Sequence, residues 1–290
     1  MTVTETGTTR PLAAASQVAA LAARSLGAPV HLEVLKHKLR RRCTWRATGP
    51  AGTAIAKAYA SDRAGTVAAR VAALDDGHPA VTTPSVLDVD EARRVVILTD
   101  VAGTPWSDPL HAGDHQIARA AGVALATWHR RWAHCAPPTF ARHTARTELA
   151  ALERQATRVA GPRRDLAVRA ARALVCEWPS ATVVHRDLYE DQILVIDRHR
   201  IGLIDLDDAA AGPAELDVGN VLAHLRLRAM RDGTRLTPSI AAFLEGYESR
   251  RPLDHGLLRR CERLTTLRLA CIHADLGEVV FRELGDGHDA

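Results

Sequence analysis

The stretch that decides the fold is VVHRDLYEDQILVIDRHRIGLIDLDDAAAGPAELDVGN, which runs from Val183 to Asn220. Its two short apolar runs, QILVI (192–196) and IGLID (201–205), are typical of a pair of strands, and DRHR between them is typical of a turn. The polar segment HRDLYEDQ leads into the first strand, and IDLDD closes the second. The sequence therefore predicts a β-hairpin with carboxylates at both of its ends.

These flanking residues have the chemistry that phosphoryl transfer to a hydroxyl requires. Asp187 offers a carboxylate that can accept the hydroxyl proton. Gln192, five residues later, offers an amide oxygen, and Asp205 offers a carboxylate at the end of the second strand. Magnesium usually takes one or two protein carboxylates together with phosphate oxygens and water. We therefore expect Gln192 and Asp205 to hold Mg²⁺, with Asp207 as a second metal-site residue and Glu190 as an exposed loop charge.

The same stretch resembles the catalytic region of the aminoglycoside phosphotransferase family, the small-molecule branch of the protein-kinase-like fold. His185 and Asp187 match the His and Asp of that family's His-Gly-Asp loop. Asp205 matches its metal-binding aspartate, and Asp217 matches an aspartate that braces the catalytic loop. VALATWHRRW (123–132) is similar to the family's helix after the hinge between lobes. The resemblance implies an α+β, bilobal kinase-like fold with a small β-rich N-lobe and a larger helical C-lobe.

The rest of the chain changes character as this fold requires. Five β-like runs lie between His31 and Thr99, with one helical segment, 62–74, that Asp62 is placed to cap. VAGTPW (101–106) is the candidate hinge. The predicted organisation is a flexible tail, an N-lobe and a C-lobe, at residues 1–10, 11–103 and 104–290, and the helices of the C-lobe are expected at about 112–134, 145–159, 163–177, 215–231, 236–248 and 255–274.

Lys57 lies in the middle of AIAKAYA, the third β-like run, where kinase-like folds place the lysine that pairs with ATP phosphates. The helical segment 62–74 contains no glutamate to pair with it, so its acidic partner stays open. The turn between the first two strands, KHKLRRR (36–42), contains no glycine. Its basic side chains, among them Lys38 and Arg42, either supply charge to the phosphates or form an exposed basic turn.

Composition narrows the class of protein. The 290 residues are 47% hydrophobic and 25% charged, as in soluble globular proteins. The net charge of +4 is carried by dispersed arginines with only 4% aromatic residues, which argues against a nucleic-acid surface. No apolar run approaches the roughly 18 residues of a membrane span. The start lacks a secretory signal pattern, and the five scattered cysteines indicate reduced thiols. We expect a cytoplasmic monomer or homodimer without nucleic-acid or membrane partners.

The leading hypothesis is an ATP- and Mg-dependent kinase for a hydroxyl of a small molecule, and GTP stays open as the donor. Only twelve positions separate Asp205 from Asp217, which leaves no room for the activation segment that presents a protein substrate. The acceptor would be an antibiotic (an aminoglycoside, a nucleoside or similar), which suggests antibiotic resistance, or a sugar or amino alcohol. Asp208 and Asp275 are candidate acceptor contacts, and the acidic C-terminal stretch favours a cationic acceptor while the basic chain as a whole does not.

The alternative is a catalytically inactive kinase-like protein that binds or regulates. The glycine-free turn, the missing helix glutamate and Gln192 in place of the family's Asn favour it. The presence of Asp187, Asp205 and Lys57 favours catalysis, since these residues carry the chemistry.

Overall fold

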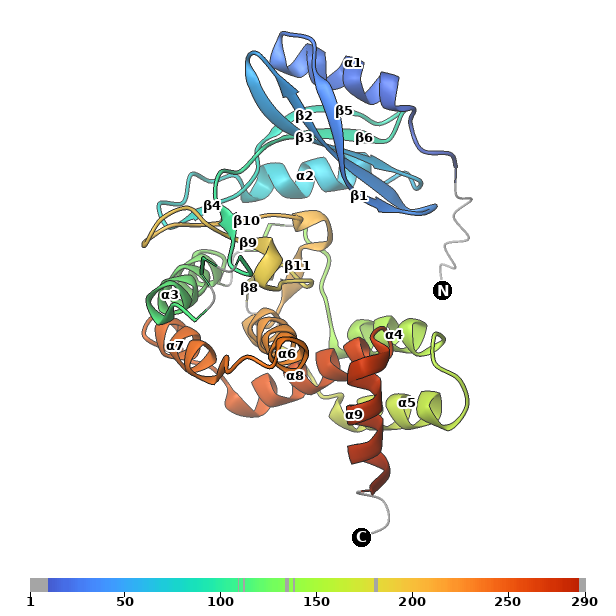
Figure 1. The fold of residues 1–290 in the computed structure, drawn as a ribbon, viewed down its shortest axis with the longest axis vertical. Coiled ribbons are helices and arrows are strands. Elements are labelled where there is room, and N and C mark those ends of the chain that lie inside the picture. Colours follow the sequence, from blue (N-terminus) through green and yellow to red (C-terminus); the bar gives the residue numbers. More distant parts are fainter. Residues whose placement is uncertain are drawn as a thin grey trace. The chain divides into compact units, whose positions relative to one another are not determined.

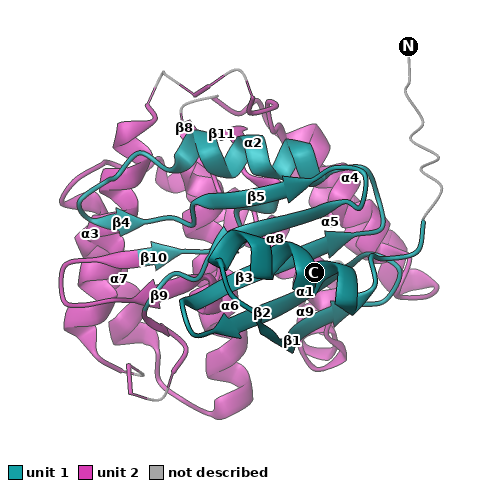
Figure 2. Ribbon diagram, turned by 90° about the horizontal axis from the view of Figure 1, so that it is seen from above, with its two compact units in different colours: residues 1–102, 202–207 teal, residues 103–201, 208–290 magenta. Residues whose placement is uncertain are grey.

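The computed structural model describes residues 10–108, 110–111, 113–133, 136–137, 139–179 and 182–286, which form two compact units (Figures 1 and 2). Unit 1 contains the chain up to Ala102 together with Gly202–Asp207, and unit 2 contains Gly103–Ile201 and the chain from Asp208 onward. All but the last residue of the expected N-terminal tail, 1–10, lies outside the described residues. The segment 202–207 is important because it carries Asp205 and Asp207 into unit 1.

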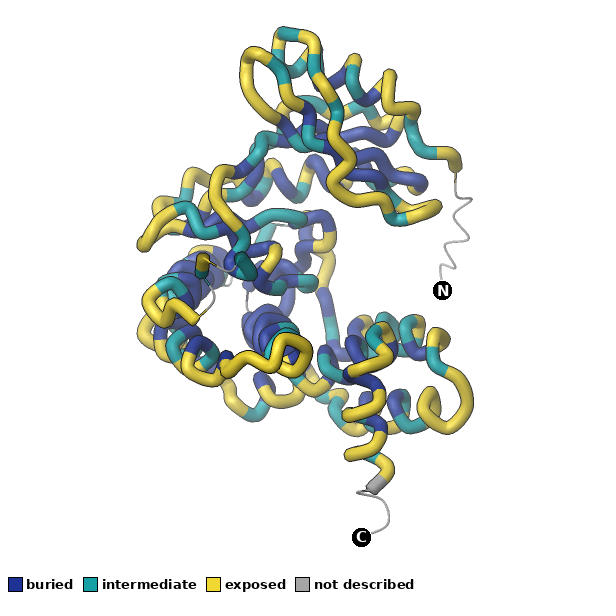
Figure 3. Tube along the Cα trace, in the orientation of Figure 1, coloured by how far each residue is buried: buried dark blue, intermediate teal, exposed yellow. Residues whose placement is uncertain are grey.

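Unit 1 is built on an antiparallel sheet of five strands in the order β1-β2-β3-β6-β5. The strands are β1 (His31–Lys38), β2 (Arg42–Gly49), β3 (Gly52–Tyr59), β5 (Val86–Asp90) and β6 (Val95–Thr99). They coincide with the five β-like runs of the sequence. β3 lies in the middle, so Lys57 faces Thr44 on one neighbouring strand and Val96 on the other. β1 is an edge strand, and most of it is exposed (Figure 3).

Helices α1 (Ala15–Leu26) and α2 (Ala64–Leu74) cover opposite faces of this sheet (Figure 1). Val18 and Leu21 of α1 pack on buried side chains of the sheet, among them Trp45 and Ile97. Because side chains alternate along a strand, Lys57 points away from the alanines of β3 that face α1. The sequence prediction missed α1. It also placed the cap of α2 one residue early, because the N-cap is Arg63 and not Asp62.

A short strand, β4 (Val81–Thr82), is hydrogen-bonded to β10 (Ile201–Leu203). This pairing leads the 202–207 segment into unit 1. A single helical turn, η2 (Leu206–Asp208), follows.

Unit 2 is mainly helical. Its helices are α3 (His115–Arg131), α4 (Ala145–Ala156), α5 (Pro162–Leu174), α6 (Ala214–Asp232), α7 (Thr237–Glu248), α8 (His255–Ala270) and α9 (Ala274–Asp286). The expected helix at 255–274 is thus wrong in its extent, because the chain breaks after Ala270 and begins α9 four residues later. Two pairs of short strands accompany the helices, β7 (Thr104–Pro105) with β9 (Ile193–Val195) and β8 (Thr182–Val184) with β11 (Ala210–Gly212).

Helices α3 and α7 approach so closely that their backbones touch. A Cβ added at Gly122 would meet the carbonyl oxygen of Phe243, and one added at Gly246 would meet the carbonyl oxygen of Arg119. Glycine is required at both positions for this packing.

Two expectations from composition can be compared with the described part of the chain. Within it, no helix combines the length and the apolarity that crossing a membrane requires. The four cysteines that it contains are free thiols, and Cys135 lies outside it.

Candidate active site

The HRD segment forms a loop between β8 and the short helical turn η1 (Glu190–Gln192). Asp217, in the first turn of α6, is fully buried beneath it. Its carboxylate accepts hydrogen bonds from the backbone N–H groups of His185 (2.7 Å) and Arg186 (2.8 Å) and lies 3.2 Å from the His129 ring. Arg186 has a left-handed backbone with φ of 74°, which costs free energy for a residue with a side chain. The buried carboxylate therefore stabilises an otherwise unfavourable loop conformation.

Asp187, at the tip of this loop, keeps a side chain that is 49% exposed. Arg268 of α8 donates to it from Nη1 at 3.4 Å, and donates from Nη2 to the side-chain oxygen of Asn220 at 3.2 Å. Asn220 in turn donates to the backbone carbonyl of Arg186. The candidate base is therefore held by a guanidinium 81 positions away in the sequence, which local pattern reasoning did not find.

A second carboxylate, Glu148 of α4, lies below the same guanidinium. Its Oε1 is 3.7 Å from Arg268 Nε, and its Oε2 is 2.9 Å from the ring nitrogen of His143. Burial raises the pKa of Glu148, but the hydrogen bond with His143 and the charge of Arg268 outweigh it and lower the pKa overall. Glu148 is therefore an anion that balances the arginine beside Asp187.

Tyr189, two residues after Asp187, makes an aromatic contact with α6. Tyr189 stacks on His224 of α6 with ring centroids 4.8 Å apart. Burial, followed by the charge of Arg268, lowers the pKa of His224 to about 3, so the ring is neutral. Glu190 is buried in η1 and burial raises its pKa, which corrects the expectation of an exposed charge.

Unit 1 contains a separate cluster of charges around Lys57. The ammonium of Lys57, whose side chain is 6% exposed, donates to Asp205 Oδ1 at 2.8 Å and to Asp207 Oδ1 at 2.6 Å. Arg42 donates to both oxygens of Asp205, at 2.7 and 2.9 Å, and to Asp207 Oδ2 at 2.5 Å. Tyr59 donates to Asp207 Oδ2 at 2.8 Å. The acidic partners of Lys57, left open by the sequence, are thus Asp205 and Asp207.

Lys57 and Asp205 are both charged in this cluster. Burial opposes the charge of Asp205, but Lys57 and Arg42 hold its pKa well below the usual range. Burial likewise opposes the charge of Lys57, but Asp207 and Asp205 raise its pKa. The pKa of Tyr59 is well above its ordinary value because of burial and Asp207, so its hydroxyl stays a donor.

All three expected metal ligands, Gln192, Asp205 and Asp207, have oxygen donors of the kind that Mg²⁺ takes. Asp205 has a left-handed backbone, with φ of 63°, and a carboxylate that already attracts two cationic side chains. Gln192 is buried at the end of η1 in unit 2. Within the described ranges, no group of three His, Cys, Asp or Glu side chains is arranged to hold a metal. A metal with few protein ligands suits magnesium, which keeps water and phosphate oxygens.

The structure also locates the remaining residues that the sequence singled out. Lys38 ends β1 and Arg42 begins β2, so the expected basic turn 36–42 is wrong in its extent and consists of residues 39–41. The backbone carbonyl of Asp208 accepts a hydrogen bond from Arg186. Asp275, in the first turn of α9, forms an ion pair with Arg231 at 2.6 Å, which lowers its pKa.

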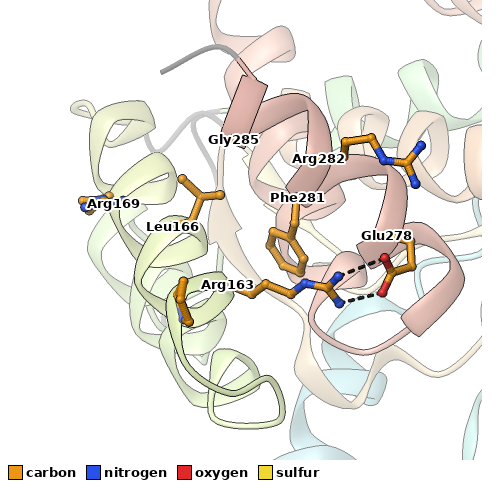
Figure 4. A pocket seen from close by; sticks show the side chains of 8 residues that line it. Arg163, Leu166, Arg169, Glu278, Phe281, Arg282 and Gly285 are labelled. Carbon is orange, nitrogen blue, oxygen red and sulfur yellow. Dashed lines mark hydrogen bonds and ion pairs between the residues drawn. The ribbon is translucent and has the colours of Figure 1, made fainter. Parts of the chain in front are cut away.

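A pocket of about 450 Å³ opens between α5 and α9 (Figure 4). Arg163 and Glu278 lie on its wall and form two hydrogen bonds, at 2.7 and 2.9 Å. None of the residues that the sequence predicted for the active site lines it. We therefore do not place the chemistry there.

Comparison with known proteins is informative at the level of fold and family. The structure is similar to a macrolide 2'-phosphotransferase from Brachybacterium faecium, with a TM-score of 0.60 and 19% identity over 92% of this chain and 95% of that chain. It is similar to an amicoumacin kinase (TM-score 0.63, 14% identity, 88% of each chain) and to an aminoglycoside-3'-phosphotransferase of type VIII (0.63, 19%, 82% and 93%). No curated protein sequence matches the chain significantly.

These similarities confirm the predicted α+β kinase-like fold. The sequence model of the phosphotransferase enzyme family matches residues 31–253, which is well over half of the chain and includes Lys57, the HRD loop and Asp217. The resemblance inferred from the catalytic stretch is thereby confirmed, and the chain belongs to the phosphotransferase enzyme family.

Proposed function

We propose that the protein is a kinase that transfers the γ-phosphoryl group of ATP to a hydroxyl of a small molecule. The observation that carries this proposal is Asp187, a half-exposed carboxylate at the tip of a loop whose backbone is held by the buried Asp217. Phosphoryl transfer depends mainly on positioning and on charge, because the chemistry itself needs little covalent assistance. A carboxylate fixed in this way suits the orientation and deprotonation of an acceptor hydroxyl.

The remaining roles follow from chemistry and family. Lys57 is assigned to the phosphates of the donor, and Asp205 and Gln192 to Mg²⁺. Bound Mg²⁺ would neutralise charge on the phosphate oxygens. Lys38 and Arg42 are assigned to the phosphates on the basis of charge, and for Arg42 this means that the nucleotide must replace its contact with Asp205.

Two carboxylates of unit 2 that would favour a cationic acceptor are already paired with arginines. Asp275 and Glu278, which made a cationic acceptor attractive, are engaged by Arg231 and Arg163. Similar structures include an aminoglycoside phosphotransferase in complex with ADP and hygromycin B and a choline/ethanolamine kinase family protein. We propose an antibiotic or a related hydroxylated metabolite as the acceptor. Action in the cytoplasm, and a resistance role if the acceptor is an antibiotic, are part of this proposal.

One observation favours the alternative of an inactive, nucleotide-binding protein. The carboxylate of Asp205 is engaged by Lys57 and Arg42 at the place where a metal ion is required. A protein that has lost turnover can keep such a contact permanently, whereas an active kinase must exchange it for the Mg-nucleotide complex.

The test is a measurement of ADP production with a panel of antibiotics, nucleosides, sugars and amino alcohols, in Mg²⁺ and in EDTA. An active kinase gives turnover that depends on both Mg²⁺ and one acceptor. Asp187→Asn should then reduce kcat by about 10²–10⁴-fold and leave AMP-PNP affinity within about twofold. Asp191→Asn, the same change at an exposed position of the same segment, is the matched control and should behave as wild type. AMP-PNP binding without turnover on any acceptor would favour the inactive protein.

A further inference from the structure

We propose that Asp207 is the positioning residue of Lys57 and not a metal ligand. In kinase-like folds a glutamate on the neighbouring helix holds the lysine that contacts the phosphates. In this chain α2 contains no glutamate, and Asp207 supplies the anion from the segment that follows β10. The inference rests on the proposed function, in which Lys57 contacts the donor phosphates.

Protein donors occupy three of the roughly four acceptor sites of the Asp207 carboxylate. Oδ1 accepts from Lys57 at 2.6 Å, and Oδ2 accepts from Tyr59 at 2.8 Å and from Arg42 at 2.5 Å. Its side chain is only 2% exposed. A magnesium ion requires near-octahedral oxygen ligands at short distance and gives up its water reluctantly. At this buried carboxylate it would have to compete with the ammonium of Lys57 and the guanidinium of Arg42.

The backbone of Asp207 is tied to the same helix that lacks the glutamate. Its carbonyl oxygen accepts hydrogen bonds from Arg63 (2.9 Å), at the N-cap of α2, and from Arg70 (2.7 Å), two turns along that helix. The carboxylate is therefore fixed relative to both α2 and the central strand β3. Asp207 thus links α2 to Lys57, as the helix glutamate does in other kinase-like folds.

Asp205 differs from Asp207 in exposure and in backbone conformation. Its side chain is 20% exposed, against 2% for Asp207, so solvent and ions reach its carboxylate although it too accepts three hydrogen bonds, one from Lys57 and two from Arg42. Its left-handed backbone is the strained geometry expected of a functional position. Asp205 is therefore assigned to the metal, and Asp207 is assigned to the positioning of Lys57.

The test measures nucleotide binding and needs no acceptor. The affinity of AMP-PNP is determined by calorimetry, in Mg²⁺ and in EDTA, for wild type, Lys57→Met, Asp207→Asn and the double variant. Asp207→Asn should weaken AMP-PNP by about tenfold in both buffers, since it acts through Lys57. The double variant should lose no more than the larger single loss. Asp205→Asn is the comparison variant: it also removes a partner of Lys57, so it should weaken AMP-PNP in both buffers, but its loss should be larger in Mg²⁺ than in EDTA. Adenosine, which lacks phosphates, should bind to all of them within about twofold of wild type.

A second variant guards against misfolding. Asp207→Asn removes part of the counter-charge of Lys57 and Arg42, and this loss can destabilise the fold. Tyr59→Phe is therefore measured as a separate, milder variant, because it deletes only one donor to the Asp207 carboxylate. Tyr59→Phe should weaken AMP-PNP by about two- to threefold in both buffers, with adenosine binding retained.

Four results would overturn the inference. A loss in Asp207→Asn that disappears in EDTA would make Asp207 a metal ligand. Losses that add fully in the double variant would make it independent of Lys57. If Lys57→Met weakens AMP-PNP while Asp207→Asn and Tyr59→Phe do not, the inference fails and the proposed function stands. If folded wild type binds no AMP-PNP in either buffer, the proposed function fails and takes the inference with it.

Discussion

Replacing Asp217 with asparagine removes one negative charge from beneath the catalytic loop without changing the volume of the side chain. The carboxylate accepts from two backbone N–H groups, those of His185 and Arg186, at 2.7 and 2.8 Å. An asparagine keeps one acceptor oxygen and turns an NH₂ group toward the other N–H. One charge-assisted bond is lost, the other is weakened, and a buried donor is left without an acceptor.

The magnitude follows from these contacts. A hydrogen bond to a charged group contributes about 1.5–3 kcal/mol, and leaving a buried donor unsatisfied costs about 1–3 kcal/mol. The left-handed backbone of Arg186, a conformation that costs about 1–3 kcal/mol, also loses the contact that sustains it. We expect the free energy of unfolding of Asp217→Asn to fall by about 3–5 kcal/mol.

Two measurements check this. Urea titration gives the loss of unfolding free energy, and hydrogen exchange gives the protection of the His185 and Arg186 amides, which should fall by far more than that of the other amides. Asp232→Asn is the matched control: it makes the same change at the end of the same helix, in an exposed pair with Arg228 that contributes at most about 1 kcal/mol. If Asp217→Asn is as stable as Asp232→Asn and both loop amides stay protected, the carboxylate does not hold the loop.

Three further predictions follow from other contacts. His224, with a native pKa of about 3, gains a proton near pH 6.5 when the chain unfolds, so its contribution to stability is complete above pH 6.5 and is lost by about 1.4 kcal/mol per pH unit below it; His224→Gln should remove that slope in urea titrations between pH 7 and 5. Gly246→Ala should lower the free energy of unfolding by about 1–3 kcal/mol, because the added Cβ meets a backbone carbonyl of α3. The control Gly285→Ala, whose Cβ meets nothing within 4 Å, should raise it by about 0.5–1 kcal/mol. Equal melting temperatures for the two variants would refute the close approach of α3 and α7. Arg268→Gln should lower kcat about tenfold through Asp187 and leave the KM for ATP unchanged, while Arg268→Lys should recover part of the loss; an unchanged kcat would show that the arginine does not position Asp187.

Short-range patterns predicted most of the secondary structure. The five strands of unit 1 were visible because alternating and β-branched residues between turn signals define a strand locally. α1 was missed although Val18, Leu21 and Ala22 have helical spacing, because its alanine-rich segment offers no side-chain cap. The end of α8 was misplaced because the apolar pattern continues through Cys271 and Ile272 into α9, and only packing decides where a helix breaks.

The sequence alone determined the family and was enough to predict Asp187, Asp205 and Lys57 as site residues, because these inferences depend on residue types at short, regular spacing. Only the tertiary structure decided which groups these residues contact. Lys57 meets Asp207 across 150 positions, and Asp187 meets Arg268 across 81. Any of the many arginines and aspartates of this chain would satisfy such a pair on charge alone. Which of them meet depends on how β3, α8 and the loops pack, since the free energy of an ion pair depends on separation and burial and not on distance along the chain.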